Sequence, residues 1–168
     1  MEGVRALYQY RGPLRSAVHR VKYRGERRRA AQLATVLAAA APELVSPWRS
    51  VLTCVVPVPL HPIRQRERGF NQSTVLACCV ARSLDRPLFE DLCRRRWTSP
   101  QVGQDRAARW NNVAGAFRWN GGPLTGTVLL VDDVVTTGAT IVAASEALVT
   151  AGAQAVVVLA LARAATYP

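Results

Sequence analysis

Short apolar runs alternate with segments of helical spacing along most of the chain. Three runs rich in Val, Leu and Ala, at 51–60, 128–132 and 154–162, are typical of strands covered on both faces. The segments 69–87 and 137–151 place their apolar residues with helical spacing. Strands that alternate with helices in this way predict βαβ units and a parallel sheet flanked by helices, an α/β fold.

The first part of the chain has the pattern of two helices. Apolar residues spaced i, i+3, i+4 and i+7 form one face of the first helix, and they are Leu14, Ala17, Val18 and Val21. Gly25 should end that helix, and an Ala-rich second helix should stop before Pro42. We therefore expect residues 1–45 to form a helical flank or hood, and residues 46–168 to form an α/β core within one compact domain.

The region between the expected helix at 69–87 and the apolar run at 128–132 is mostly polar and basic. Residues 87–97 have the composition of a strand. Residues 98–117 carry turn residues and arginines, with one short helix expected near 105–114. Long loops of this kind inside compact domains are usually functional, so we expect a mobile loop with a functional role.

Composition narrows the class of protein. Hydrophobic residues make up 49% of the 168 residues and charged residues 20%, which excludes a disordered chain. No apolar run reaches the roughly 18 residues of a membrane span, and the N-terminus lacks a long apolar signal region, so we expect a cytoplasmic location. The four cysteines form no C-x-x-C pair, which indicates buried thiols rather than a zinc site.

The net charge is +11, and Lys22 is the only lysine. The arginines gather in three patches, at 24–29, 64–68 and 94–109. Such a charge fits compositional bias, a nucleic-acid surface, or a site for an anion with several phosphates, and the charge alone does not choose among them.

Paired acids follow the apolar run near residue 130. Asp132 and Asp133 are expected at the carboxyl end of a parallel strand, where ligands bind in such sheets. Residues 136–140 then form a turn at a helix N-terminus, where Gly138 lets the backbone approach a phosphate. Carboxylates accept hydrogen bonds from hydroxyls, so the stretch predicts a ribose 5-phosphate ligand. A plain helix cap explains a threonine there, but not two adjacent acids after a buried strand.

The stretch VLLVDDVVTTGAT, residues 128–140, closely resembles the phosphoribosyl pyrophosphate motif of type I phosphoribosyltransferases. The resemblance implies that family's fold, with Asp132 and Asp133 holding the ribose 2- and 3-hydroxyls. It also implies that the 5-phosphate is bound by Thr136, Thr137, Gly138, Ala139 and Thr140.

Three further blocks, at 19–34, 55–73 and 101–117, look like the ComF family of phosphoribosyltransferase-like proteins linked to competence for DNA uptake. Many ComF proteins begin with a cysteine-rich zinc ribbon. This chain starts just after where that segment would end, so zinc binding is not carried over. The resemblance implies single-stranded DNA or a competence helicase as partners, and a homo-oligomer is a further candidate assembly.

The segment after the first strand of the core resembles the pyrophosphate loop of the enzymes. In that family backbone N–H groups of the loop bind pyrophosphate, and Leu60, His61 and Ile63 can donate whereas Pro59 and Pro62 cannot. Arginine side chains suit bidentate contact with phosphate oxygens. The residues expected to bind pyrophosphate are Leu60, His61 and Arg64.

Three arginines are candidates for catalytic contacts with the diphosphate. Arg66 follows the pyrophosphate loop, and Arg106 and Arg109 belong to the segment that resembles the flexible closing loop. We expect Mg²⁺ to bind mainly through the substrate diphosphate, with no direct protein ligand.

These features predict a pentosyl glycosyltransferase that binds phosphoribosyl pyrophosphate and transfers its phosphoribosyl group to a nitrogen acceptor, releasing pyrophosphate. Thr136 stands where 6-oxopurine enzymes usually have an aspartate, which argues against hypoxanthine–guanine salvage. The 101–117 loop has no lysine, unlike orotate-type enzymes. Lys22, Tyr23 and Arg24 are hood candidates over the acceptor. The alternative is a non-catalytic protein that binds the same ligand or assists DNA uptake.

Overall fold

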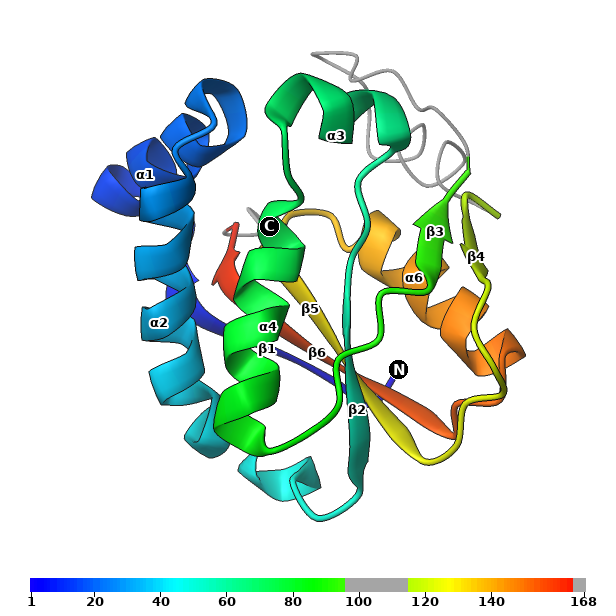
Figure 1. The fold of residues 1–168 in the computed structure, drawn as a ribbon. Helices are drawn as coiled ribbons and strands as arrows, with labels where there is room; N and C mark the ends of the chain where they lie inside the picture. The colour runs from blue at the N-terminus through cyan, green and yellow to red at the C-terminus, as the bar shows by residue number, and fades with distance from the viewer. Residues whose placement is uncertain (96–114, 165–168) are drawn as a thin grey trace.

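A computed structural model describes residues 1–95 and 115–164 of the chain (Figure 1). Its centre is a four-stranded sheet in the order β1-β6-β5-β2, in which every neighbouring pair is parallel. The strands are β1 (Gly3–Gln9), β2 (Leu52–Pro57), β5 (Thr127–Val135) and β6 (Ala155–Arg163). None of the helices in the described ranges has the length and apolar character required to cross a bilayer.

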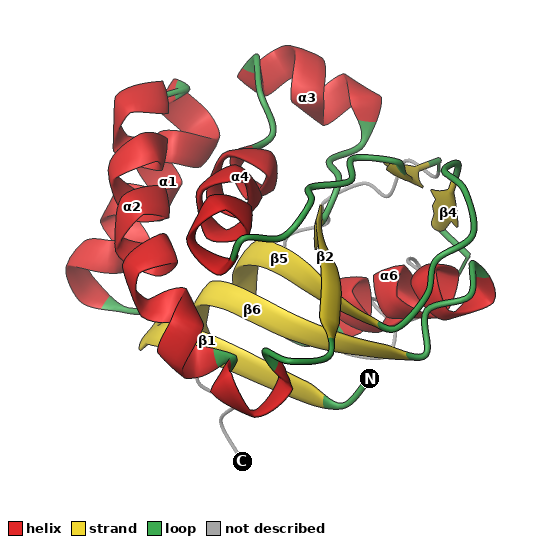
Figure 2. Ribbon diagram, turned by 60° about the horizontal axis from the view of Figure 1, so that its bottom comes forward, coloured by secondary structure: helices red, strands yellow, loops and turns green. Residues whose placement is uncertain are grey.

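Helices cover both faces of the sheet (Figure 2). One face carries α1 (Gly12–Arg24), α2 (Arg27–Leu44) and α4 (Gln72–Leu84), and the other carries α6 (Ala139–Thr150). A short hairpin of β3 (Leu92–Arg94) and β4 (Phe117–Trp119) packs on the α6 side, and α3 (Pro62–Arg68) follows β2. The prediction of a parallel α/β sheet flanked by helices, consistent with a phosphoribosyltransferase-like fold, is confirmed.

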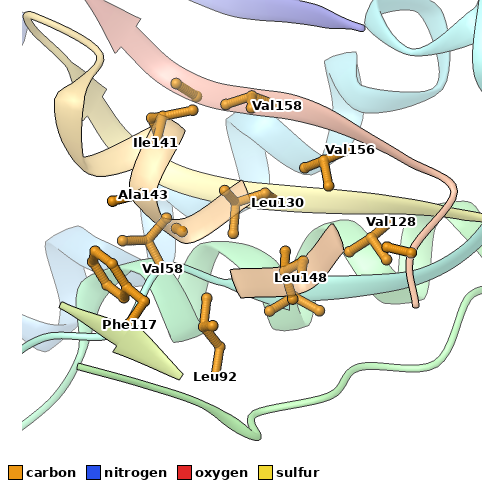
Figure 3. Close-up of a cluster of buried hydrophobic side chains, with 14 of the residues drawn as sticks. Val58, Leu92, Phe117, Val128, Leu130, Ile141, Ala143, Leu148, Val156 and Val158 are labelled. Atoms are coloured by element: carbon orange, nitrogen blue, oxygen red, sulfur yellow. The ribbon is translucent and has the colours of Figure 1, made fainter. Parts of the chain in front are cut away.

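Alternation along β5 divides the core between the two faces. Val128 and Leu130 point to the cluster that contains Leu148 of α6 and Phe117 of the hairpin (Figure 3). Leu129 and its alternate neighbours pack against the α2–α4 layer on the opposite face. Because both faces are buried, the strand needs apolar residues at consecutive positions, which explains the continuous apolar runs of the sequence.

The N-terminal segment contributes a strand that the sequence pattern did not indicate. β1 pairs in parallel with β6, with Gly3 opposite Val157, so the segment before α1 joins the sheet instead of only flanking it. Its burial is partial at most positions, as expected for an edge strand, and its polar residues weaken the apolar signal. The two predicted helices follow it, and the α1 helix ends at Gly25 as predicted.

Two other segments differ from the prediction. The second helix does not stop before Pro42 but continues to Leu44, because a proline in the last turn removes a single N–H donor while Val45 N–H still donates to Ala41 O at 3.0 Å. The expected loop after β2 contains the helix α3, which has Pro62 in its first turn and a left-handed Gly69 after its end.

Candidate functional site

A cleft of about 300 Å³ lies at the carboxyl ends of the strands, and we call it the carboxylate cleft. Its charged lining combines two acids with four cations contributed by α1, α3, β3 and β5, namely Asp132, Asp133, Lys22, Arg64, Arg68 and Arg94. A larger hollow of about 640 Å³ between β4 and α6 is lined by none of the predicted site residues. The charged lining therefore favours the smaller cleft as the ligand site. Its volume is at the lower end of the range for ligand pockets.

Asp132 is a buried carboxylate held by two donors. The Ser73 hydroxyl donates to its Oδ1 at 3.0 Å, and the backbone N–H of Asp133 donates to the same oxygen at 2.8 Å. The side chain is only 8% exposed. Burial, followed by the charge of Asp133, raises the pKa of Asp132 to about 7, against the opposing effect of Lys22. This carboxylate therefore changes charge near neutral pH.

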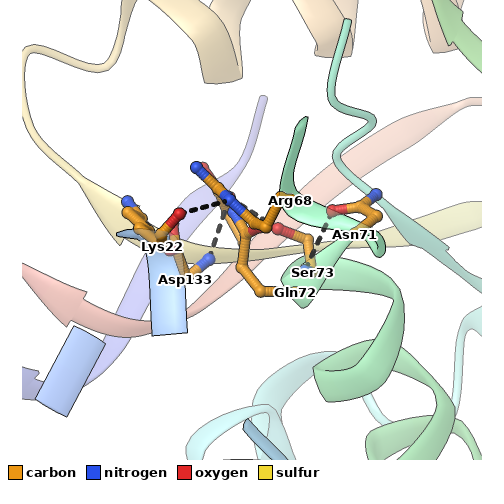
Figure 4. Close-up of polar contacts among 7 residues, drawn as sticks. Lys22, Arg68, Asn71, Gln72, Ser73 and Asp133 are labelled. Atoms are coloured by element: carbon orange, nitrogen blue, oxygen red, sulfur yellow. Dashed lines mark hydrogen bonds and ion pairs between the residues drawn. The ribbon is translucent and has the colours of Figure 1, made fainter. Parts of the chain in front are cut away.

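Asp133 is buried beside Asp132 but has a cationic partner. The Lys22 ammonium of α1 lies 2.8 Å from Asp133 Oδ2, and Figure 4 shows the two side chains meeting. Burial lowers the pKa of Lys22, but the charge and hydrogen bond of Asp133, together with the charge of Asp132, outweigh burial, so the pKa stands above its ordinary value. The only lysine of the chain thus joins the N-terminal hood to the acids of β5.

Arg68 holds α3 against the end of α1. Its Nε donates to the backbone carbonyl oxygen of Lys22 at 3.0 Å, and its Nη1 donates to Oε1 of Gln72 (Figure 4). Burial lowers the pKa of Arg68, and the charge of Asp133 opposes that effect. Arg68 therefore links three helices around the carboxylate cleft and keeps Lys22 in position.

Asn71 places Ser73 at the start of α4. Its Oδ1 accepts from the Ser73 N–H at 3.1 Å, as an N-cap does, and its Nδ2 donates to the Val58 carbonyl oxygen at 3.0 Å. The same side chain therefore fixes both the first turn of α4 and the segment after β2.

The predicted phosphate turn follows β5 directly. The strand is longer than predicted and continues to Val135, so both acids lie within it. Thr136 and Thr137 form a bend, and Gly138, with φ of +81°, is the N-cap of α6. Thr140 lines the carboxylate cleft together with the two acids. A helix N-terminus offers N–H donors to anions, so the 5-phosphate assignment of residues 136–140 stays a prediction with suitable local geometry.

The structure places some of the residues predicted to bind pyrophosphate in the lining of the carboxylate cleft and others outside it. Leu60 and Arg64 line the carboxylate cleft, and Arg64 forms an ion pair with Glu67 at 3.0 Å. His61 instead caps α3, where its Nδ1 accepts from the Ile63 N–H at 3.3 Å, and this bond uses one of the expected pyrophosphate donors. Arg66 is exposed on α3 and is not part of the cleft lining.

Arg106 and Arg109, predicted to be catalytic, lie outside the described residues. Sequence reasoning missed Ser73 and Arg94, both of which line the carboxylate cleft. The polar cluster after Gly69 was a usable signal for Ser73, because it predicts a helix start next to a strand end. Arg94 gave no such signal, because its place depends on how the β3–β4 hairpin packs.

No family model matches the chain. Competence protein F of Haemophilus influenzae is 37% identical over 115 residues, which cover 66% of this chain and 50% of that protein. Competence protein ComFC of Bacillus subtilis is 29% identical over 156 residues, covering 88% and 58%. The DNA utilization protein YhgH of Salmonella typhi is 35% identical over 164 residues, covering 94% and 70%. The chain thus spans about half to two thirds of the length of these relatives.

Proposed function

The chain belongs to the ComF family, and from that premise we propose that it binds phosphoribosyl pyrophosphate and transfers the phosphoribosyl group to a nitrogen nucleophile. The observation that carries the proposal is the pair of buried carboxylates, Asp132 and Asp133, beside the N-terminus of α6. Burial of a carboxylate costs free energy unless the group has hydrogen-bonding partners. A sugar diol supplies such partners, because its hydroxyls donate to carboxylate oxygens.

The ligand would lie with its ribose over the end of β5. Its two ring hydroxyls would donate to oxygens of Asp132 and Asp133, and its 5-phosphate would meet the first turn of α6 near Thr140. The diphosphate would then lie among the cations of the carboxylate cleft, which balance its negative charge.

In the reaction, the bond between C1 of the ribose and the diphosphate oxygen breaks as the nitrogen–C1 bond forms. The electron pair of the broken bond leaves on pyrophosphate, and the nitrogen releases a proton to solvent or a nearby base. Charge that develops on the leaving group is stabilised by fixed cations, so the protein contributes mainly by positioning and electrostatics.

Mg²⁺ is the proposed companion of the diphosphate. The oxygens of the substrate diphosphate would hold the ion, while Asp132 and Asp133 keep their role toward the ribose hydroxyls. When bound with the substrate, the ion would neutralise part of the charge of the leaving group.

Binding tests the first part of the proposal. Calorimetry with phosphoribosyl pyrophosphate and Mg²⁺ should show saturable binding that the double variant Asp132→Asn/Asp133→Asn weakens by about 10-fold or more, because each lost charged acceptor removes a charge-assisted bond. Asp91→Asn, which changes an exposed acid outside the cleft, is the matched control. No binding by the folded wild-type chain would overturn the proposal.

Turnover tests the second part. Release of pyrophosphate should be measured with the bound donor and a panel of bases, amines and other nitrogen nucleophiles. Release that depends on one class of acceptor supports transfer. Binding of the donor without release of pyrophosphate for any acceptor would indicate a ligand-binding protein and reject the proposed transfer reaction.

A second candidate function is a DNA-uptake accessory protein that binds single-stranded DNA. The relatives are named as competence and DNA utilization proteins, and Arg24 and Arg28, which follow the cleft residue Tyr23 in the sequence, are exposed. Tyr23 lines that cleft, is 70% exposed, and has its ring 4.3 Å from that of His19. Aromatic rings beside arginines suit unpaired bases.

Anisotropy of labelled single-stranded DNA tests the second candidate. Affinity should fall steeply with salt, and Arg24→Gln/Arg28→Gln should reduce both the affinity and the salt slope. Arg82→Gln/Arg118→Gln changes two exposed arginines elsewhere and should have a smaller effect. Equal losses from both double variants would indicate unspecific charge attraction and reject this surface.

A further inference from the structure

The Lys22 ammonium lies in the carboxylate cleft, although its helix belongs to the N-terminal hood. It lines the cleft together with Asp132 and Asp133, and its side chain is 24% exposed. The sequence suggested a position over the acceptor for this residue. In the structure its Nζ lies 2.8 Å from Asp133 Oδ2, at the acids that the ribose of the proposed ligand would meet.

Several contacts hold Lys22 in this position. Arg68 Nε donates to its backbone carbonyl oxygen at 3.0 Å, and the ammonium pairs with Asp133 (Figure 4). Its neighbour Val21 is buried in a small apolar cluster that also contains Phe70. A side chain that is already held by its surroundings loses little freedom when a ligand binds, so its hydrogen-bond donors are arranged in advance.

The ion pair retains hydrogen-bonding capacity on both partners. The pKa of Lys22 stands above its ordinary value, so the group is an ammonium with three N–H donors at neutral pH. Within the described ranges, Asp133 Oδ2 is buried and has the ammonium as its one polar contact. A carboxylate oxygen can accept a second hydrogen bond. The pair therefore offers a donor and an acceptor side by side to a ligand.

A hydroxyl group is the ligand chemistry that matches this pair. Its oxygen accepts from the ammonium while its hydrogen donates to the carboxylate, so one hydroxyl meets both charged groups. A phosphate oxygen would be repelled by the carboxylate, and a ligand cation would be repelled by the ammonium. The ion pair therefore favours a neutral sugar hydroxyl over either kind of ion.

We infer that Lys22 and Asp133 together bind one ring hydroxyl of the ribose, and that this contact makes the site select a complete diol over a deoxy sugar. The inference rests on the proposed function and adds a residue of α1 to a ribose site that the sequence motif draws from β5 alone. Hydrogen bonds to charged groups are the stronger ones, and a site built to bind a hydroxyl rejects analogues that lack it.

Calorimetry with three sugar phosphates tests the inference: ribose 5-phosphate, 2-deoxyribose 5-phosphate and 3-deoxyribose 5-phosphate. The wild type should bind ribose 5-phosphate about 10- to 100-fold more tightly than the analogue that lacks the bound hydroxyl. Lys22→Met should reduce this preference by about 10-fold, because only the sugar that carries the hydroxyl loses the bond to the ammonium.

Equal losses of affinity for all three sugars in Lys22→Met would indicate general attraction of the phosphate and would overturn the inference, as would equal wild-type affinities. The matched control is Arg15→Gln, which removes an exposed positive charge from the same helix outside the cleft lining and should leave the preference unchanged. If Lys22→Met does not fold, Lys22→Met/Asp133→Asn decides, since a folded double variant that keeps the wild-type preference also overturns the inference.

The outcomes separate this inference from the proposed function when phosphoribosyl pyrophosphate with Mg²⁺ is titrated alongside. Binding of that donor, with a sugar preference that does not depend on Lys22, keeps the function and rejects the role of Lys22. A preference for ribose 5-phosphate that depends on Lys22, without binding of the donor, keeps the role of Lys22 and rejects the function. Absence of binding for all four ligands by the folded wild type rejects both.

Discussion

Asp132 and Asp133 are adjacent in the chain but have different environments. Asp133 meets the Lys22 ammonium at 2.8 Å, whereas Asp132 has hydroxyl and amide donors. Burial raises the pKa of Asp132 most, and the neighbouring charge of Asp133 raises it further. The pair thus joins an acid that holds a cation to an acid whose pKa stands near neutrality.

This division predicts how stability depends on pH. The folded pKa of Asp132, about 7, lies above the unfolded value, so its contribution to stability is complete below pH 4 and is lost as the pH rises through 7. Asp132→Asn removes that titration. Between about pH 4 and 8, urea midpoints should therefore fall less with rising pH in the variant than in the wild type.

Salt should be held constant in that series, since surface charges also titrate. Asp91→Asn, an exposed acid, should retain the wild-type slope. Identical slopes for the wild type and Asp132→Asn would show that Asp132 is ionised throughout the range.

Removal of Lys22 should leave a buried charge without a partner. Lys22→Met is expected to lower the free energy of unfolding by roughly 1–3 kcal/mol, because Asp133 stays buried and charged. Denaturant titration measures the loss. The double variant Lys22→Met/Asp133→Asn removes both charges and should recover part of the stability. A double variant as unstable as the sum of the two single changes would mean that the ion pair contributes no coupling energy.

At the scale of elements, the start of α4 depends on one side chain with two functions. Asn71→Ala loses both the cap and the bond to Val58, and it should lower the free energy of unfolding by about 1–2 kcal/mol. Asn71→Ser keeps a capping oxygen but loses the donor to Val58, so its loss should be smaller. Chemical denaturation of both variants checks the order. Equal stability of Asn71→Ala and the wild type would show that the cap is dispensable.

The turn between α6 and β6 needs a glycine. Gly152 has φ of +107°, and a Cβ built there would lie 2.6 Å from the Leu124 carbonyl oxygen. Gly152→Ala should therefore cost about 1–3 kcal/mol of stability through backbone strain. Gly122→Ala is the control, because a Cβ at 122 meets no atom within 4 Å. The midpoint of thermal unfolding should be clearly lower for Gly152→Ala than for Gly122→Ala. Similar midpoints would show that the alanine at 152 causes no backbone strain.

Periodicity predicted elements well where burial dominates and poorly where local chemistry dominates. Apolar spacing predicts the strands β5 and β6 and the helices α1 and α4, because each element buries apolar residues in the core. The helix α3 has no buried residue, so its capping residues, not its apolar pattern, define it. The edge strand β1 is only half-buried and gives a weak pattern for the same reason.

At the scale of the whole molecule, the sequence predicted the part of the site that is contiguous in the chain. Asp132, Asp133 and the turn at 136–140 follow one another, so their joint position at a strand end could be inferred. Contacts between distant segments could not be inferred, because they depend on how α1, α4 and the hairpin pack. Lys22 on Asp133 and Arg94 beside Leu60 are of this kind.

The sheet also predicts a role for the first residues of the chain. Deletion of residues 2–9 would remove β1 and leave β6, an almost fully apolar strand, as an open edge. The shortened chain should unfold at lower denaturant concentration and associate as its concentration rises. Light scattering and urea titration measure both effects. Tyr8→Ser, which changes an exposed side chain within the same strand, should leave the chain dispersed.

The strand order has a consequence for how the protein is made. β6 lies between β1 and β5, so Gly3 cannot pair with Val157 before the ribosome has synthesised β6. Contacts between such distant segments slow folding, because long loops must close before any pairing rewards them. β1 and β6 therefore pair late in folding. Until they do, the growing chain exposes apolar strands, which are the surfaces that chaperones protect.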